Sequence, residues 1–303
     1  MEQTKEIYWH LPGLCYCRLL NHALFNLMQQ YPDKFREGYK IGSVYGTIPG
    51  SIWNGGRSVF GISPRSDVEK IVKSYNDRGI PARFTWTNSL LEEKHVHDTY
   101  CNMIMQVADN GMNQVLVNRD CLEDYLRREY PNYKVISSTT KRMTDMAGLK
   151  AELEKDYYLV VLDYDLNHDE AVLTELQPYA DKIEILVNEI CYPNCPMRAA
   201  HYADESKAQL EYDILSKFQC PNKATPRVFE ESMKRPAFIS NEQIGDYIAK
   251  GYVNFKIVGR GLPQDFVKES YLYFLVKDEE REVIREKMDA MLAAWSKPTQ
   301  VRR

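Results

Sequence analysis

The chain has 303 residues, of which 44% are hydrophobic and 27% charged, and its formal net charge is −4. These values indicate a folded globular protein and argue against a disordered chain or a general nucleic-acid binder, DNA-binding proteins included. No apolar run approaches the length of a membrane span, and the N-terminus lacks the apolar core of a signal peptide. We therefore expect a cytoplasmic protein without a membrane partner, whose seven cysteines are reduced thiols or metal ligands.

The first 38 residues are predicted to form an N-terminal helical segment, with one helix over residues 7–30. Its apolar side chains recur close to the helical period, at Leu19, Leu20, Leu24, Leu27 and Met28. Cys15 and Cys17 lie near the start of this segment. We interpret them first as core thiols and, as an alternative, as spare metal ligands.

Eight apolar runs then alternate with helical patterns along the chain. The predicted strands lie near residues 40–45, 81–87, 114–117, 133–136, 157–162, 183–187, 236–239 and 252–258. Such alternation predicts a parallel sheet, and eight strands are the number that closes a TIM-like (β/α)8 barrel. We expect one α/β-barrel domain over residues 1–303, closed or nearly so, with an irregular insertion at 219–235 and a C-terminal helix within 278–303.

A cysteine-bearing loop follows the predicted strand at 183–187. Cys191 and Cys195 are followed by His201 and, further along, by Cys220. Thiols and an imidazole at these positions can converge on one zinc ion or iron–sulfur cluster. The spacing matches no common zinc-finger or ferredoxin pattern, and the alternative is a set of ordinary thiols in a cytosolic protein.

Polar residues follow almost every predicted strand. In a parallel barrel the carboxyl ends of the strands meet on one face, which carries the chemistry. We therefore predict a pocket for a small anionic or hydrogen-bonding ligand, with Arg57 and Arg260 facing the same cavity. The candidate ligand-binding residues are Arg57, Asn88, Lys141, Asn188, Lys256 and Arg260, and the candidate acid/base groups are Asp163, Asp165 and Glu189. The alternative for each is a loop residue that caps the next helix.

Two stretches resemble a known family. Residues 188–202, which begin Asn-Glu-Ile-Cys, and Phe255-Lys-Ile-Val-Gly-Arg260 resemble the collagenase-like peptidase family, peptidase family U number thirty-two. Asn54-Gly-Gly-Arg57, residues 137–141 and residues 163–165 are similar to a bacterial subgroup of it, and the resemblance spans about residues 41–276.

The resemblance implies an α/β-barrel core. Some relatives act in anaerobic ubiquinone hydroxylation or RNA base hydroxylation, and some hold a four-iron four-sulfur cluster through cysteines. This chain departs from the four-cysteine pattern, because only Cys191, Cys195 and Cys220 lie in the matching region. The fourth ligand would be His201 or one of Cys15, Cys17, Cys101 and Cys121, so zinc and an iron–sulfur cluster both stay open.

Three functions follow from these observations. The first is a metal- or cluster-containing enzyme that modifies, for example hydroxylates, a small molecule or RNA. The second is a peptidase or other hydrolase, as the family name suggests, although no paired nucleophile and base can be identified in the sequence. The third is a non-catalytic subunit of a partner protein, in which a metal only holds the cysteine loop.

Overall fold

Eight parallel strands close into a barrel in the computed structural model, which describes residues 6–214 and 218–296. The strands are β1 (Ile7–Pro12), β2 (Tyr39–Gly46), β3 (Ala82–Trp86), β4 (Gln114–Val117), β5 (Lys134–Ser137), β6 (Leu159–Val161), β7 (Ile183–Leu186) and β8 (Asn254–Lys256). Each strand pairs with the next one along the chain, and β8 pairs with β1 to close the ring. The predicted (β/α)8 barrel is confirmed.

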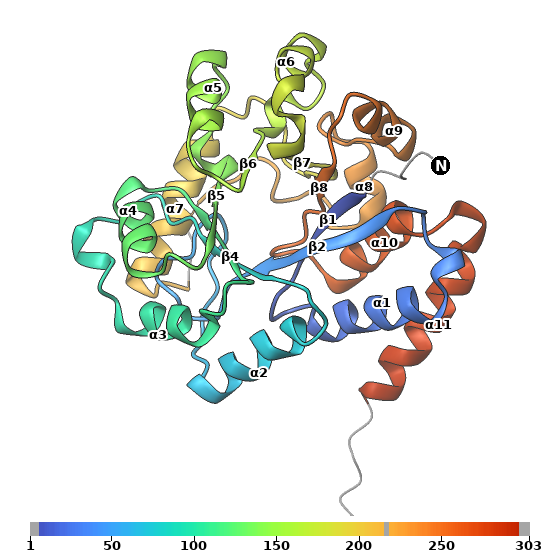
Figure 1. The fold of residues 1–303 in the computed structure, drawn as a ribbon, viewed down its shortest axis with the longest axis horizontal. Coiled ribbons are helices and arrows are strands. Elements are labelled where there is room, and N and C mark those ends of the chain that lie inside the picture. The colour runs from blue at the N-terminus through green and yellow to red at the C-terminus, as the bar shows by residue number, and fades with distance from the viewer. Residues whose placement is uncertain (1–5, 215–217, 297–303) are drawn as a thin grey trace, which may run out of the picture.

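Helices surround the barrel on its outside (Figure 1). They are α1 (Arg18–Gln30), α2 (Arg65–Asn76), α3 (Thr99–Ala108), α4 (Asp120–Glu129), α5 (Met146–Glu154), α6 (Glu170–Glu175), α7 (Arg198–Glu211), α8 (Phe229–Met233), α9 (Asn241–Ala249), α10 (Gln264–Leu275) and α11 (Arg281–Trp295). Short 3-10 helices cover Pro32–Lys34, Glu93–His95, Thr139–Lys141, Tyr164–Leu166, Gln177–Lys182 and Asp278–Glu280. In the part of the chain that is described, no helix has both the length and the apolar character that a membrane crossing requires.

The strands are buried on both faces, as parallel strands covered by helices must be. All residues of β3, β4 and β7, for example, are buried. Their outward side chains pack under the helices in the main core. The inward side chains fill the barrel with a smaller apolar cluster of Leu116, Ile136, Leu159, Val161 and Leu186, next to a group of buried charges described below.

The structure corrects the N-terminal prediction. Residues 7–12 form the first barrel strand, and the helix begins only at Arg18. The strand ends at Pro12, and Gly13 follows with φ +85°, a conformation that favours glycine and breaks a helix. The aromatic residues Tyr8 and Trp9 and the following proline–glycine pair were the signals for a strand and a turn.

The predicted strand at residues 236–239 is also wrong. Ile239 N donates one hydrogen bond to Val187 O (2.9 Å), but β7 already pairs with β6 on one side and β8 on the other. The ring therefore has no position for this segment. The predicted insertion at 219–235 ends in the short helix α8, and α11 runs to Trp295; residues 1–5 and 297–303 of the two terminal segments lie outside the described residues.

Candidate functional site

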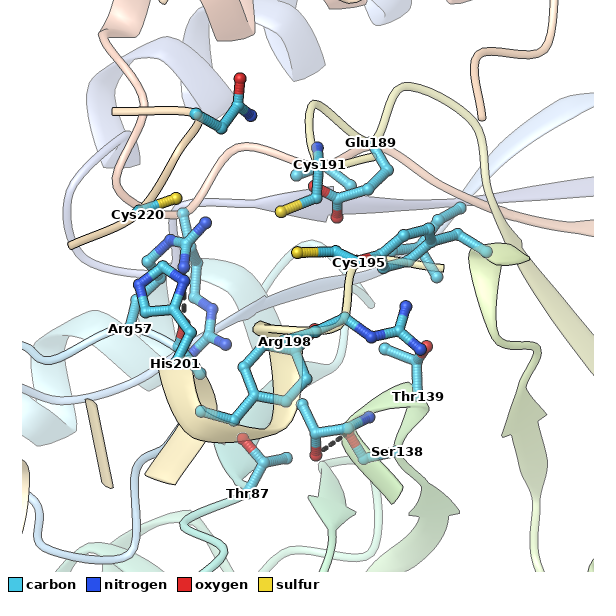
Figure 2. A pocket seen from close by; sticks show the side chains of 18 of the residues that line it. Arg57, Thr87, Ser138, Thr139, Glu189, Cys191, Cys195, Arg198, His201 and Cys220 are labelled. Atoms are coloured by element: carbon cyan, nitrogen blue, oxygen red, sulfur yellow. Dashed lines mark hydrogen bonds between the residues drawn. The ribbon is translucent and has the colours of Figure 1, made fainter. Parts of the chain in front are cut away.

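A pocket opens at the carboxyl ends of the barrel strands (Figure 2). Strands β2, β3, β4, β7 and β8 contribute residues to it directly, and the loops after β5, β6 and β7 contribute others. The cysteine loop, the first turns of α7 and the segment 218–222 complete the wall. The side chains that line it include Tyr45, Arg57, Thr87, Ser138, Thr139, Tyr164, Glu189, Cys191, Cys195, Arg198, His201, Tyr202, Cys220, Lys256 and Arg260.

The predicted metal ligands all line this one pocket. Figure 2 shows the sulfur atoms of Cys191, Cys195 and Cys220 turned towards a common space. His201 stacks on the Phe218 ring, with centroids 4.4 Å apart, and its Nε2 lies 3.6 Å from Glu205 Oε1. The three thiols thus line one pocket instead of lying in separate apolar pockets.

The three thiols and the His201 imidazole have the chemistry of metal ligands but not yet the arrangement. Thiolates with an imidazole are the donors that zinc and iron–sulfur clusters take. Within residues 6–214 and 218–296, however, no three His, Cys, Asp or Glu side chains are grouped closely enough to hold an ion. The donor set therefore fits the group in kind, and His201 would have to leave Glu205 to join it. Burial raises the pKa of Cys191 to about 11, so this thiol carries its proton at neutral pH.

The alternative fourth ligands lie elsewhere. Cys17 and Cys101 belong to the apolar core. Cys15 donates to Thr47 O, and Cys121 donates to Leu91 O. Cys15 and Cys17 therefore behave as the core-side thiols that the sequence favoured.

Arg57 and Arg260 line the same pocket, which is the placement that the sequence predicted; their role in binding stays a prediction. Arg260 Nη1 donates to Asn54 Oδ1 (2.9 Å) and to Thr85 Oγ1 (3.0 Å). Gly56 has φ +75°, and a Cβ atom there would lie 3.0 Å from Arg260 Nη2. The glycine thus allows the loop that carries Arg57 to approach Arg260 closely.

Lys256 links the pocket to the charged interior of the barrel. Its Nζ lies 3.1 Å from Glu184 Oε1 and 4.4 Å from the centre of the Tyr45 ring. Glu184, which is fully buried, also pairs with Arg83, and His10 Nε2 lies 3.3 Å from it. Burial lowers the pKa of Lys256 to about 8, although Glu184 opposes that shift.

Asp163 and Asp165 both bind Arg198. The Arg198 guanidinium donates to Asp163 Oδ2 (2.6 Å) and to Asp165 Oδ1 (3.1 Å), and its Cζ lies 4.4 Å from the Tyr164 ring centre. Burial raises the pKa of Asp163 despite this cation. The two carboxylates lie outside the pocket lining, whereas Arg198 lies on it.

Glu189 is the candidate acid/base group that does line the pocket. It is 9% exposed, and its Oε1 accepts a hydrogen bond from Cys191 N (2.9 Å). The carboxylate therefore lies beside the first thiol of the loop. Burial is the main cause of the raised pKa of the Cys191 thiol, and the negative charge of Glu189 is the second.

The other predicted binding residues have structural partners away from the pocket. Asn88 Nδ2 donates to Ile52 O and Ser206 O, which joins the loop after β3 to α7. Asn188 Oδ1 accepts from Val258 N (2.6 Å). Lys141 Nζ donates to Glu152 Oε1 (2.5 Å) and Tyr157 OH (2.9 Å).

Sequence reasoning assigned no role to several pocket residues. Arg198 and Tyr202 are four positions apart at the start of α7, which is the spacing of one helix face and could have identified them. Thr87 Oγ1 and Thr139 Oγ1 are buried in the pocket wall without a hydrogen-bond partner among the described residues. Because buried hydroxyls are normally paired, these two are suited to a polar ligand.

Comparisons with known proteins give two similarities. No protein-family model matches the chain. Over 121 residues it is 32% identical to the uncharacterized protease MJ1657 of Methanocaldococcus jannaschii, which covers 38% of this chain and 35% of that protein, so the match spans about a third of the relative's length. The fold is similar to that of the U32 peptidase Mk0906, with a TM-score of 0.54 and 15% identity over 87% of this chain and 96% of that one.

Proposed function

From the confirmed resemblance to the U32 collagenase-like peptidase family, we propose that this chain is a cytoplasmic enzyme with a zinc ion or an iron–sulfur cluster. Cys191, Cys195, Cys220 and His201 would hold the group, and the reaction would modify a small molecule or an RNA base, hydroxylation being the first candidate. The observation that supports this most is the convergence of the three thiols on the pocket at the active face of the barrel.

The chemistry is divided between the bound group and the pocket. Zinc would supply a Lewis acid, and a cluster would supply electron transfer. Glu189 lies beside Cys191 and can accept a proton from a ligand in the pocket or donate one to it. Lys256 and the buried hydroxyl of Thr87 offer donors to the ligand's oxygen atoms. The cysteine loop and the first turns of α7 form one wall of the pocket.

Hydrolysis is the second candidate, because one geometric feature favours it. His201 is oriented by Glu205 and shares the pocket with the three thiols. A base that is held by a carboxylate and shares a pocket with a thiol provides the two groups that a nucleophilic hydrolase needs. The names of the two similar proteins, a protease and a peptidase, agree with this alternative.

Metal analysis and a visible spectrum of protein purified without oxygen test the proposal. We expect stoichiometric iron with visible absorption, or stoichiometric zinc, in the wild type and in the control Cys121→Ser, whose thiol lies outside the pocket. Cys195→Ser should lose the metal. Wild-type protein without stoichiometric metal would contradict the proposal and leave hydrolysis as the candidate.

The same variant separates a catalytic metal from a structural one. If Cys195→Ser abolishes turnover while the unfolding midpoint is kept, the metal is catalytic. If it lowers the free energy of unfolding by several kcal/mol, the metal holds the loop, because metal binding and local folding are then coupled. A structural metal would favour the role of a non-catalytic partner subunit.

A further inference from the structure

We propose that Arg227 and Arg260 form an oxyanion site beside the main pocket, and that it binds the phosphate or carboxylate end of the substrate. The proposal rests on the proposed function in one respect, since it takes the pocket with the thiols as the place of reaction. It adds the class of substrate, an organic anion, and a binding residue, Arg227, that neither the sequence nor the fold pointed to.

The two arginines line a second cavity next to the pocket. The loops after β1, β2 and β8 form this cavity, and Arg260 lines both it and the main pocket. Its other walls are mainly small or apolar residues: Gly13, Leu14, Gly46, Pro49, Val59 and Leu262. A ligand can therefore extend from the thiols past Arg260 to Arg227.

The cations of this region differ in how their charges are balanced. Arg198 is held by two aspartates, and Lys256 is paired with Glu184. The protein already neutralises these two charges, so they add little attraction for the negative charge of a ligand, although Lys256 can still donate a hydrogen bond. Arg227 and Arg260 instead donate to neutral groups: Arg227 Nη2 to Asn222 O (3.3 Å), and Arg260 Nη1 to Asn54 and Thr85. Across the described residues, neither arginine forms an ion pair with a carboxylate within 4.0 Å.

A third arginine adds to the local positive charge. Arg57 packs against Gly261, where an added Cβ atom would lie 3.3 Å from Arg57 Cδ. Arg260 packs in the same way against Gly56. Burial, together with the charge of Arg57, lowers the pKa values of both Arg227 and Arg260. Burial lowers the pKa of Arg57 as well, but Glu189, Tyr202 and Glu205 outweigh it, so that the pKa of Arg57 is raised and not lowered.

An oxyanion is the ligand that would balance the positive charges of these neighbouring arginines. Guanidinium groups offer pairs of donors that match the oxygen atoms of carboxylate and phosphate. The cavity also borders Leu262 and Pro263, at the start of α10, where the helix dipole favours negative charge. The loop after the last barrel strand is moreover a common place for phosphate in such barrels. Arg227 and Arg260 are the main evidence for an oxyanion, and the start of α10 and the loop after β8 are consistent with it.

Binding of inorganic phosphate and of acetate, each compared with chloride at matched ionic strength, tests the site by calorimetry and thermal shift. We expect saturable binding of one or both ions to the wild type, with a raised melting temperature. Binding of phosphate alone assigns a phosphoryl substrate, and binding of acetate assigns a carboxylate. Arg227→Gln should weaken the affinity about tenfold or more, because charge-assisted hydrogen bonds are lost.

The controls keep the outcome clear. Among the described residues Arg227 makes one long hydrogen bond, to Asn222 O, so its replacement should leave the melting temperature without ligand unchanged. Arg65→Gln removes an equal charge from the exposed surface of α2 and should bind the ions as the wild type does. Cys195→Ser should also keep oxyanion binding, even if no metal is ever found. No binding above chloride, or equal binding by Arg227→Gln, would overturn the proposal.

Discussion

The buried charges inside the barrel allow one prediction to be worked out in detail. Glu184 is fully buried and serves two cations, Arg83 and Lys256, while His10 lies beside them. Arg83 Nη2 donates to His10 Nδ1 (2.8 Å), so the imidazole accepts and is neutral. Replacing Glu184 by Gln keeps the shape of the side chain and removes the one anion of this group.

The cost can be divided between the two cations. Arg83 cannot lose its proton, and leaving a buried charge without its partner costs about 3–5 kcal/mol. Lys256 can lose its proton. Because its pKa is about 8 in the native protein, becoming neutral at pH 7 costs at most about 1.4 kcal/mol. We therefore expect Glu184→Gln to lose about 3–6 kcal/mol, a large part of the stability of an ordinary domain.

Urea unfolding at pH 7, followed by circular dichroism, measures this loss as a lower midpoint at unchanged slope. Glu69→Gln is the matched control, since Glu69 pairs with Arg65 on the exposed surface of α2 and should change stability by no more than about 0.5 kcal/mol. A loss below about 1 kcal/mol in Glu184→Gln would refute the reasoning, because it would mean that water already screens these charges.

Two further predictions concern pH and the loop near the pocket. Burial lowers the pKa of His10 to about 3, so the unfolded chain takes up this proton first, and stability is lost as the pH falls from about 6.5 towards 3. Urea unfolding of His10→Gln should show about 2 kcal/mol less loss of stability between pH 7 and 5 than the wild type. His22, whose pKa burial lowers to about 4, should still cause a loss of similar size in this variant. The same pH dependence of stability in His10→Gln and in the wild type would contradict this prediction. In Gly55→Ala the new Cβ would lie 2.2 Å from Thr87 O, so the loop must shift, at a cost of about 1–3 kcal/mol, whereas Gly245→Ala, in open space on α9, should gain up to about 1 kcal/mol. Equal melting temperatures of the two alanine variants would contradict this difference.

The sequence by itself predicted the closed barrel and the face at which the carboxyl ends of its strands meet. Continuous apolar runs such as Ile183–Leu186 mark strands that are buried on both faces, and they recur between helical patterns. Parallel strands then place their carboxyl ends together, so the cysteine loop after β7 and Arg260 after β8 had to meet. The resemblance to a family rested on the same two loops.

The apolar character of residues 236–239 was not enough to identify a barrel strand. This segment was predicted as a strand and lies outside the ring, whereas residues 7–12, predicted as part of a helix, are in it. What excludes residues 236–239 is the pairing of β7 with β8, a contact between segments that are about seventy residues apart in the chain.

Only the tertiary structure decided which polar residues face the pocket. Asp163, Lys141 and Asn188 all follow strands, as Glu189 does, but each has a partner that comes from another part of the chain. Arg198 lies 35 positions from Asp163, and no local pattern announces that pairing. Secondary structure follows from the order of neighbouring residues, whereas the balance of a buried charge depends on the groups that folding brings within a few ångströms of it.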